Sequence, residues 1–161
     1  GDPTSGNVHS PFKQQVGGRA ALGLASFTSP VTHSLPYLPP AYMSSSLGKR
    51  GSILVSLGKE GLYAQPPRLD NSVACPPAFD LRQCESFAVL SGPDCIWRAA
   101  EAAWLDGKLR LSPANWTSGL EALGSRAYFA NWPLVTVTNA FGIPLLPWAQ
   151  PLDARTAEIC P

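Results

Sequence analysis

Two long stretches of this sequence contain no charged residue and are interrupted by prolines. Residues 20–48 and 127–152 lack Asp, Glu, Lys and Arg, and they account for 55 of the 161 positions. Proline fixes its own φ, lacks a backbone N–H and disfavours helical conformation in the residue before it. We therefore do not expect these stretches to pack as ordinary helices or sheet, and the tail cannot be a central strand. Their large apolar side chains should lie against a neighbouring surface.

The centre of the chain, residues 78–124, is predicted to be helical. Residues 80–90 place apolar side chains three and four positions apart, and Pro93 suits the first turn of a second helix that ends at Gly107. Ser112 predicts the start of a third, shorter helix that ends at Gly124. The short link between the first two helices predicts an antiparallel helical hairpin. The side chains expected on the buried helix faces are Leu81, Cys84, Phe87, Ala88, Ile96, Ala99, Ala100, Ala103 and Trp104.

Short strands are predicted on both sides of this helical centre. A ten-residue repeat that begins Ser-Leu-Gly-Lys indicates a small meander with strands at 52–56 and 61–64, and residues 128–129 and 134–138 are also strand-like. The sequence therefore predicts an α+β fold. Its expected parts are an extended Pro-, Ser- and Gly-rich arm (1–50), a small core (51–140) and a Pro-rich apolar tail (141–161).

Four cysteines, Cys75, Cys84, Cys95 and Cys160, favour a disulfide-stabilised chain. Three pairings are open, and buried free thiols are the alternative. With two histidines and no C-x2-C pair, no metal site is expected. Disulfides indicate an oxidising compartment: an organelle lumen or intermembrane space, a periplasm, a cell surface or a virion. The sequence starts at Gly1 without Met, which fits the removal of a targeting segment.

Candidate catalytic groups do not form a recognisable site. Cys95 at a predicted helix start resembles a thiol nucleophile, but the available bases, His9 and His33, both lie in the arm. No G-x-S-x-G turn is present, and the carboxylates fall on predicted solvated faces. We therefore expect no catalytic residue and no cofactor.

The roles of the five tryptophans and of one modification motif stay open at the level of the sequence. The five tryptophans (Trp97, Trp104, Trp116, Trp132 and Trp148) fit core packing, a protein interface or a sugar-stacking platform. Asn115-Trp116-Thr117 matches the N-glycosylation sequon, which matters only in a eukaryotic secretory pathway.

The favoured interpretation is a non-catalytic subunit of a multi-protein assembly that binds its neighbours through the uncharged segments. A net charge of +1 argues against nucleic acid, and no transmembrane helix is expected, although the tail could touch a membrane surface. A secreted, disulfide-stabilised binding module, with carbohydrate as one candidate ligand, is the alternative, and an unrecognised hydrolase is the third. The predicted contact residues are Phe27, Leu35, Tyr37, Leu38, Tyr42, Phe141, Ile143, Leu145 and Trp148.

Overall fold

The computed structural model describes residues 39–58, 67–72, 74–75, 84–117, 119–129, 135–140, 142–153 and 159–160, with the single positions 21, 24 and 156. This part of the chain is mostly antiparallel sheet. The strands are β1 (Tyr42–Leu47), β2 (Ile53–Leu57), β3 (Arg68–Leu69), β4 (Phe87–Gly92), β5 (Ile96–Leu105), β6 (Lys108–Pro113), β7 (Glu121–Ala127), β8 (Val137–Thr138) and β9 (Trp148–Pro151). A 3-10 turn, η2 (Lys49–Gly51), joins β1 to β2.

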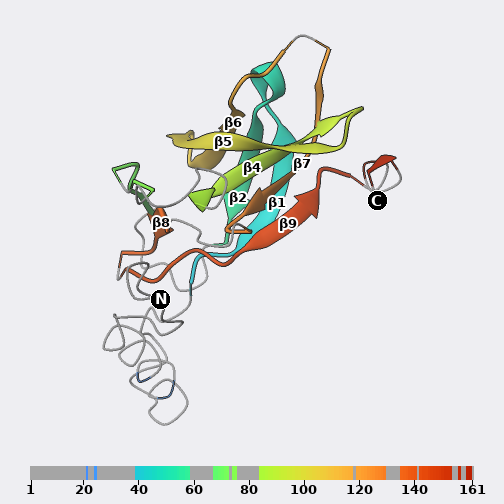
Figure 1. Ribbon diagram of the computed structural model, residues 1–161. Helices are drawn as coiled ribbons and strands as arrows, with labels where there is room; N and C mark the ends of the chain where they lie inside the picture. The colour runs from blue at the N-terminus through green and yellow to red at the C-terminus, as the bar shows by residue number, and fades with distance from the viewer. Residues whose placement is uncertain are drawn as a thin grey trace.

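Seven of these strands form one sheet in the order β1-β2-β6-β5-β4-β7-β9, and β3 pairs with β8 in a second, two-stranded sheet. The larger sheet curls until it is nearly closed, so that β1 lies beside β9 (Figure 1). The Leu146 N–H donates to the Pro40 carbonyl at 2.9 Å, and the rings of Tyr42 and Trp148 lie 5.6 Å apart. These contacts join the two ends of the sheet into a barrel-like shape.

The expectation of an α+β fold with a helical hairpin is wrong. Strands β4, β5 and β6 and the start of β7 occupy the residues predicted to be helical, and no described helix reaches seven residues. All six residues of β4 are buried, and its backbone is paired on both sides, with β5 and with β7. An unbroken buried run also contains apolar residues three and four apart, so the helical spacing was a coincidence.

The predicted helix ends are hairpin turns. Gly107, expected to stop a helix, follows Asp106 in the turn between β5 and β6. Both residues have positive φ, 49° for Asp106 and 75° for Gly107. Two consecutive positive φ values are typical of a tight two-residue β-hairpin, in which Asp-Gly is a favoured pair. The predicted third helix from Ser112 is instead the end of β6, a turn at residues 114–115 and the start of β7.

Two of the strand predictions are confirmed. The strand expected at 52–56 is β2, and β8 falls within the expected 134–138. Residues 128–129 lie beyond the end of β7 rather than in a strand, and the strand expected at 61–64 lies outside the described residues.

The uncharged stretches do form regular sheet, since they contain β1, β8 and β9, but β1 and β9 are edge strands, which tolerate proline. The sheet thus includes strands from the expected arm, core and tail.

The core fills the inside of the curled sheet. Its fully buried members include Ile53, Val55, Val89, Leu109 and Leu111. Trp148 lies 6.1 Å from the Phe87 ring, and its indole N–H donates to the Ser125 hydroxyl at 3.1 Å. The buried polar end of this large side chain is therefore satisfied.

Two disulfides are present, Cys75–Cys84 and Cys95–Cys160. The second joins the β4–β5 turn to the residues after β9, across a sequence separation of 65. Such crosslinks are typical of proteins in oxidising, extracytoplasmic compartments. Among the described residues no helix is long and apolar enough to cross a bilayer.

Candidate binding groove

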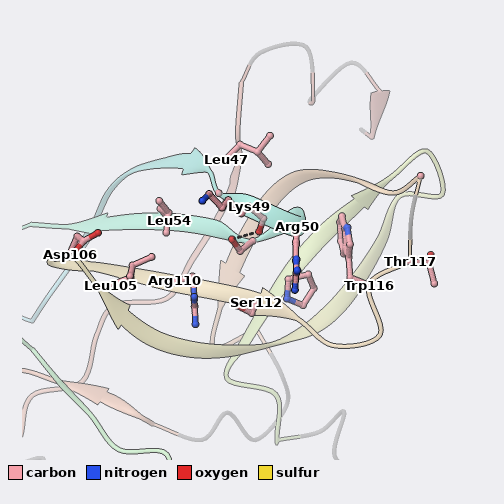
Figure 2. A pocket seen from close by; sticks show the side chains of 14 residues that line it. Leu47, Lys49, Arg50, Leu54, Leu105, Asp106, Arg110, Ser112, Trp116 and Thr117 are labelled. Atoms are coloured by element: carbon pink, nitrogen blue, oxygen red, sulfur yellow. Dashed lines mark hydrogen bonds between the residues drawn. The ribbon is translucent and has the colours of Figure 1, made fainter.

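An open groove of about 1270 Å³ lies on the outer side of the sheet. Its walls come from the β1–β2 turn, the β5–β6 turn and the β6–β7 connection, and strand β6 runs along it (Figure 2). Arg110, Ser112 and Arg50 lie between Asp106 at one end and Trp116 and Thr117 at the other. The groove is therefore elongated along a strand rather than closed into a deep pocket.

The floor of the groove follows from the alternation of β6. Leu109 and Leu111 are fully buried in the core, so Arg110 and Ser112 point to the opposite, outer face. The cross-strand neighbours of Arg110 are Leu54 on β2 and Ala103 on β5. The aliphatic part of the Arg110 side chain is therefore flanked by apolar residues of the two neighbouring strands.

One wall is the β1–β2 turn, which carries Lys49 and Arg50. Arg50 has a φ of 54°, and the Ser52 hydroxyl and amide both donate to the Lys49 carbonyl, at 2.8 and 3.1 Å. The Gly48 N–H donates to the Ser52 carbonyl at 2.7 Å. These local bonds fix the two cationic residues on a well-defined turn.

The facing wall is the β6–β7 connection, which carries Trp116. A Cβ added at Gly51 would lie 2.1 Å from Cε2 of the Trp116 indole, so the ring is seated directly on the glycine backbone. The Ala114 N–H donates to the Ala99 carbonyl at 2.9 Å, which ties the start of this connection to β5. Trp116 is half-buried and lines the groove from this supported position.

The lining is positively charged. Lys49, Arg50 and Arg110 face a single carboxylate, Asp106. Nε of Arg110 is buried and has no hydrogen-bond partner in the described part of the chain. Leu47 and Leu105 add exposed apolar surface, 59% and 41% exposed. This set of groups can bind an amphipathic, anionic ligand, and the lining offers no nucleophile with a paired base.

A second hollow is lined by Arg98 and Arg126, which both have ion-pair partners in this chain. Arg126 donates to Glu85 at 3.0 Å and lies 4.7 Å from the centre of the Trp97 ring. Arg98 donates to Asp94 at 2.6 Å. The Ser91 hydroxyl also donates to Asp94, and this bond, followed by the Arg98 charge, holds the pKa of the Asp94 carboxyl below its usual range. These groups have protein partners already, so they serve the fold.

The sequence-predicted site residues lie elsewhere. Cys95, considered as a nucleophile, is in a disulfide, and His9 and His33 lie outside the described residues. No cluster of His, Cys, Asp and Glu in the described segments could hold a metal ion.

Of the predicted contact residues, Ile143, Leu145 and Trp148 are buried in the core of this chain, at most 6% exposed. Tyr42 is half-buried against Trp148. Phe27, Leu35, Tyr37, Leu38 and Phe141 lie outside the described residues. The three core residues therefore offer little surface to a partner.

The groove residues were not identified from the sequence. The repeat that contains Lys49 indicated a meander rather than a binding site, and Trp116 was one of five tryptophans that fitted several roles. One signal was available: Lys108 to Ser112 alternates polar and apolar side chains strictly, which is typical of a half-buried strand with Arg110 on its outer face.

No family model and no curated protein matches this sequence. The fold is similar to that of a carbohydrate acetylesterase from Xanthomonas citri, with a TM-score of 0.64 and 16% sequence identity. The match covers 92% of this chain and 29% of that protein. The chain therefore corresponds to less than a third of the neighbour's length, and at this identity the likeness concerns the fold.

Proposed function

We propose that this chain is a disulfide-stabilised, non-catalytic module that binds carbohydrate in the groove beside Trp116. The observation that carries the proposal is the seating of the Trp116 indole on the Gly51 backbone, at the edge of an open groove with hydroxyl and cationic side chains. A rigidly held aromatic ring packs against the C–H faces of a sugar, while neighbouring polar groups bond its hydroxyls.

The shape of the groove supports a polymeric ligand. It follows strand β6 from Asp106 to Thr117 and is open along its length, so that a chain could lie in it without threading (Figure 2). The likeness to part of a carbohydrate acetylesterase supports a role beside carbohydrate chemistry, and the two disulfides support an extracytoplasmic setting. The module would hold a polysaccharide, while any chemistry would be performed by another domain.

Binding of immobilised polysaccharides, followed by calorimetry with the polymers that bind, tests this function. Trp116→Ala should abolish binding, because it removes the aromatic platform. Trp97→Ala is the matched control, since Trp97 lies on the outer face of the sheet beneath Arg126 and outside the groove. Circular dichroism should show that both variants are folded. The proposal fails if a broad panel of polysaccharides gives no binding, or if both variants bind as the parent does.

A further inference from the structure

We infer that the groove selects carbohydrate polymers bearing carboxylates, that is, polyuronates, and that Arg110 is the residue that makes this selection. The inference rests on the proposed function, because it specifies the ligand of the same groove. It follows from the contacts of Arg110, from the contrast with the other arginines of the sheet and from the charge of the lining.

Arg110 lacks a partner where one would be expected. Its Nε is buried, yet it has no hydrogen-bond acceptor among the described residues, and its cross-strand neighbours Leu54 and Ala103 have only apolar side chains. A buried donor without an acceptor is costly, and a guanidinium presents its donors in a fork that matches a carboxylate. The Nε itself is covered, so a ligand carboxylate would pair with the guanidinium where it lines the groove and where the described residues offer it no ion pair.

The other arginines of the neighbouring strands differ in having an ion pair, although the Nε of Arg126 is also buried without a hydrogen-bond partner. Arg98 on β5 is paired with Asp94 at 2.6 Å, and Arg126 on β7 is paired with Glu85 at 3.0 Å. Arg110 on β6, which lines the groove, forms no ion pair within the described segments. Of these three arginines, the one that has no ion pair in the described segments is the one that lines the groove.

The remaining charges of the lining favour an anion. Lys49 and Arg50 stand on the β1–β2 turn above Arg110, while Asp106 lies at the far end of the groove from Trp116 (Figure 2). A surface lined by one sign of charge raises the local concentration of ligands of the opposite sign. The net charge of the whole chain is only +1, so the attraction is local to the groove and does not favour nucleic acid.

The test compares polymers that differ only in charge. Polygalacturonate and alginate carry free carboxylates, whereas methyl-esterified polygalacturonate and the propylene glycol ester of alginate keep the sugar backbone and lose the charge. We expect one of the acids to bind about tenfold more tightly than its ester, and this preference to weaken as salt is raised. Dextran sulfate, which carries sulfates but no carboxylate, should bind more weakly than that acid, because its sulfates lack the planar carboxylate geometry.

Variants assign the preference to Arg110. Arg110→Gln should remove most of the preference for the acid over the ester, with the remainder coming from Lys49 and Arg50. Arg98→Gln, which removes an equal charge outside the groove, should leave the preference unchanged. Thermal unfolding of both variants checks that the fold is retained. Equal binding of acids and esters, tighter binding of dextran sulfate, or an unchanged preference in Arg110→Gln would overturn the inference and leave carbohydrate binding standing. Failure of every polymer to bind would overturn both proposals.

Discussion

Gly51 and Gly107 have nearly the same left-handed backbone conformation in very different surroundings. Their φ values are 70° and 75°. A Cβ at Gly51 would overlap the Trp116 indole, whereas nothing lies within 4 Å of a Cβ at Gly107. The pair therefore separates the cost of positive φ from the cost of displacing Trp116.

Gly107→Ala is expected to lower the free energy of unfolding by about 1–2 kcal/mol, the cost of positive φ for a residue with a Cβ. Gly51→Ala should cost about 1–3 kcal/mol more, because the indole must move. Urea denaturation measures both values, and tryptophan fluorescence reports the displacement. Carbohydrate binding should weaken in Gly51→Ala alone. Equal losses of stability in the two variants would show that Trp116 is not seated on Gly51.

Asp94 gives a pH-dependent contribution to stability. The Ser91 hydroxyl and the Arg98 guanidinium hold its pKa below the ordinary value of 3.8 in the folded chain. A lowered folded pKa means that the stabilisation is present above the unfolded pKa and is lost as pH falls through the folded one. The carboxyl is exposed, so we expect the effect to be small.

Asp94→Asn should therefore melt at a lower temperature than the parent at neutral pH. The difference should stay constant down to about pH 5 and shrink below about pH 4, as the parent carboxyl becomes protonated. Thermal unfolding across this range measures it. A difference in melting temperature that is undiminished at about pH 2 would mean that the charge of Asp94 is not the cause.

At the scale of the elements, a break was easier to predict than the strands beside it. Gly107, expected to stop a helix, lies in the β5–β6 turn, whereas Ser91 and Gly92, expected to link two helices, end β4 and the turn follows at residues 93–95. The segment between them was predicted to be a helix because its apolar side chains recur three and four positions apart. Pairing of β5 with β4 and β6 overrides that local preference, and single-sequence periodicity does not include it. The Asp106-Gly107 pair was the local signal for a hairpin.

The groove was less accessible to sequence reasoning than the fold. The alternation in β6 predicts that Arg110 faces outward, but not that its neighbours are Leu54 and Ala103, which lie on other strands. The contact of Trp116 with Gly51 joins residues 65 positions apart in sequence. Both facts depend on strand order, so only the expectation of a binding module, and not its site, could come from the sequence.

The two disulfides should differ in their contribution to stability. Cys95–Cys160 closes a segment of the chain with a separation of 65, against 9 for Cys75–Cys84. Loop-closure entropy predicts a contribution of about 4 kcal/mol for the longer loop and about 3 kcal/mol for the shorter one. The longer crosslink also ties the segment after the edge strand β9 to the β4–β5 turn.

Replacing both members of each pair by serine tests this ranking. Cys95→Ser with Cys160→Ser should lower the free energy of unfolding by more than Cys75→Ser with Cys84→Ser, by about 1–2 kcal/mol. Guanidinium denaturation of the two double variants gives the comparison. A larger loss from the shorter loop would show that native-state contacts, rather than chain entropy, govern the crosslinks.

At the scale of the whole molecule, one sheet unites segments that composition separates. β1 lies in the predicted arm and β9 in the predicted tail, yet Tyr42 contacts Trp148 and Leu146 bonds Pro40. Closing the sheet in this way brings its two edge strands together and removes surface on which other chains could pair. Part of the uncharged, apolar sequence is thus used inside this chain.

Removing the uncharged residues that precede β1 tests whether they belong to the fold or bind a partner. All strand pairings of the larger sheet lie within residues 42–151. A chain that starts at residue 39 should therefore unfold cooperatively, with a melting temperature within about 4 °C of the full chain, because no described sheet contact is removed.

We propose that residues 20–38 are where the chain contacts another protein or a second copy of itself. Size-exclusion chromatography with light scattering should then give a mass above the monomer for the full chain and a monomer for the shortened one. Two monomers would contradict self-association through this segment, and loss of cooperative unfolding in the shortened chain would show that the segment belongs to the fold.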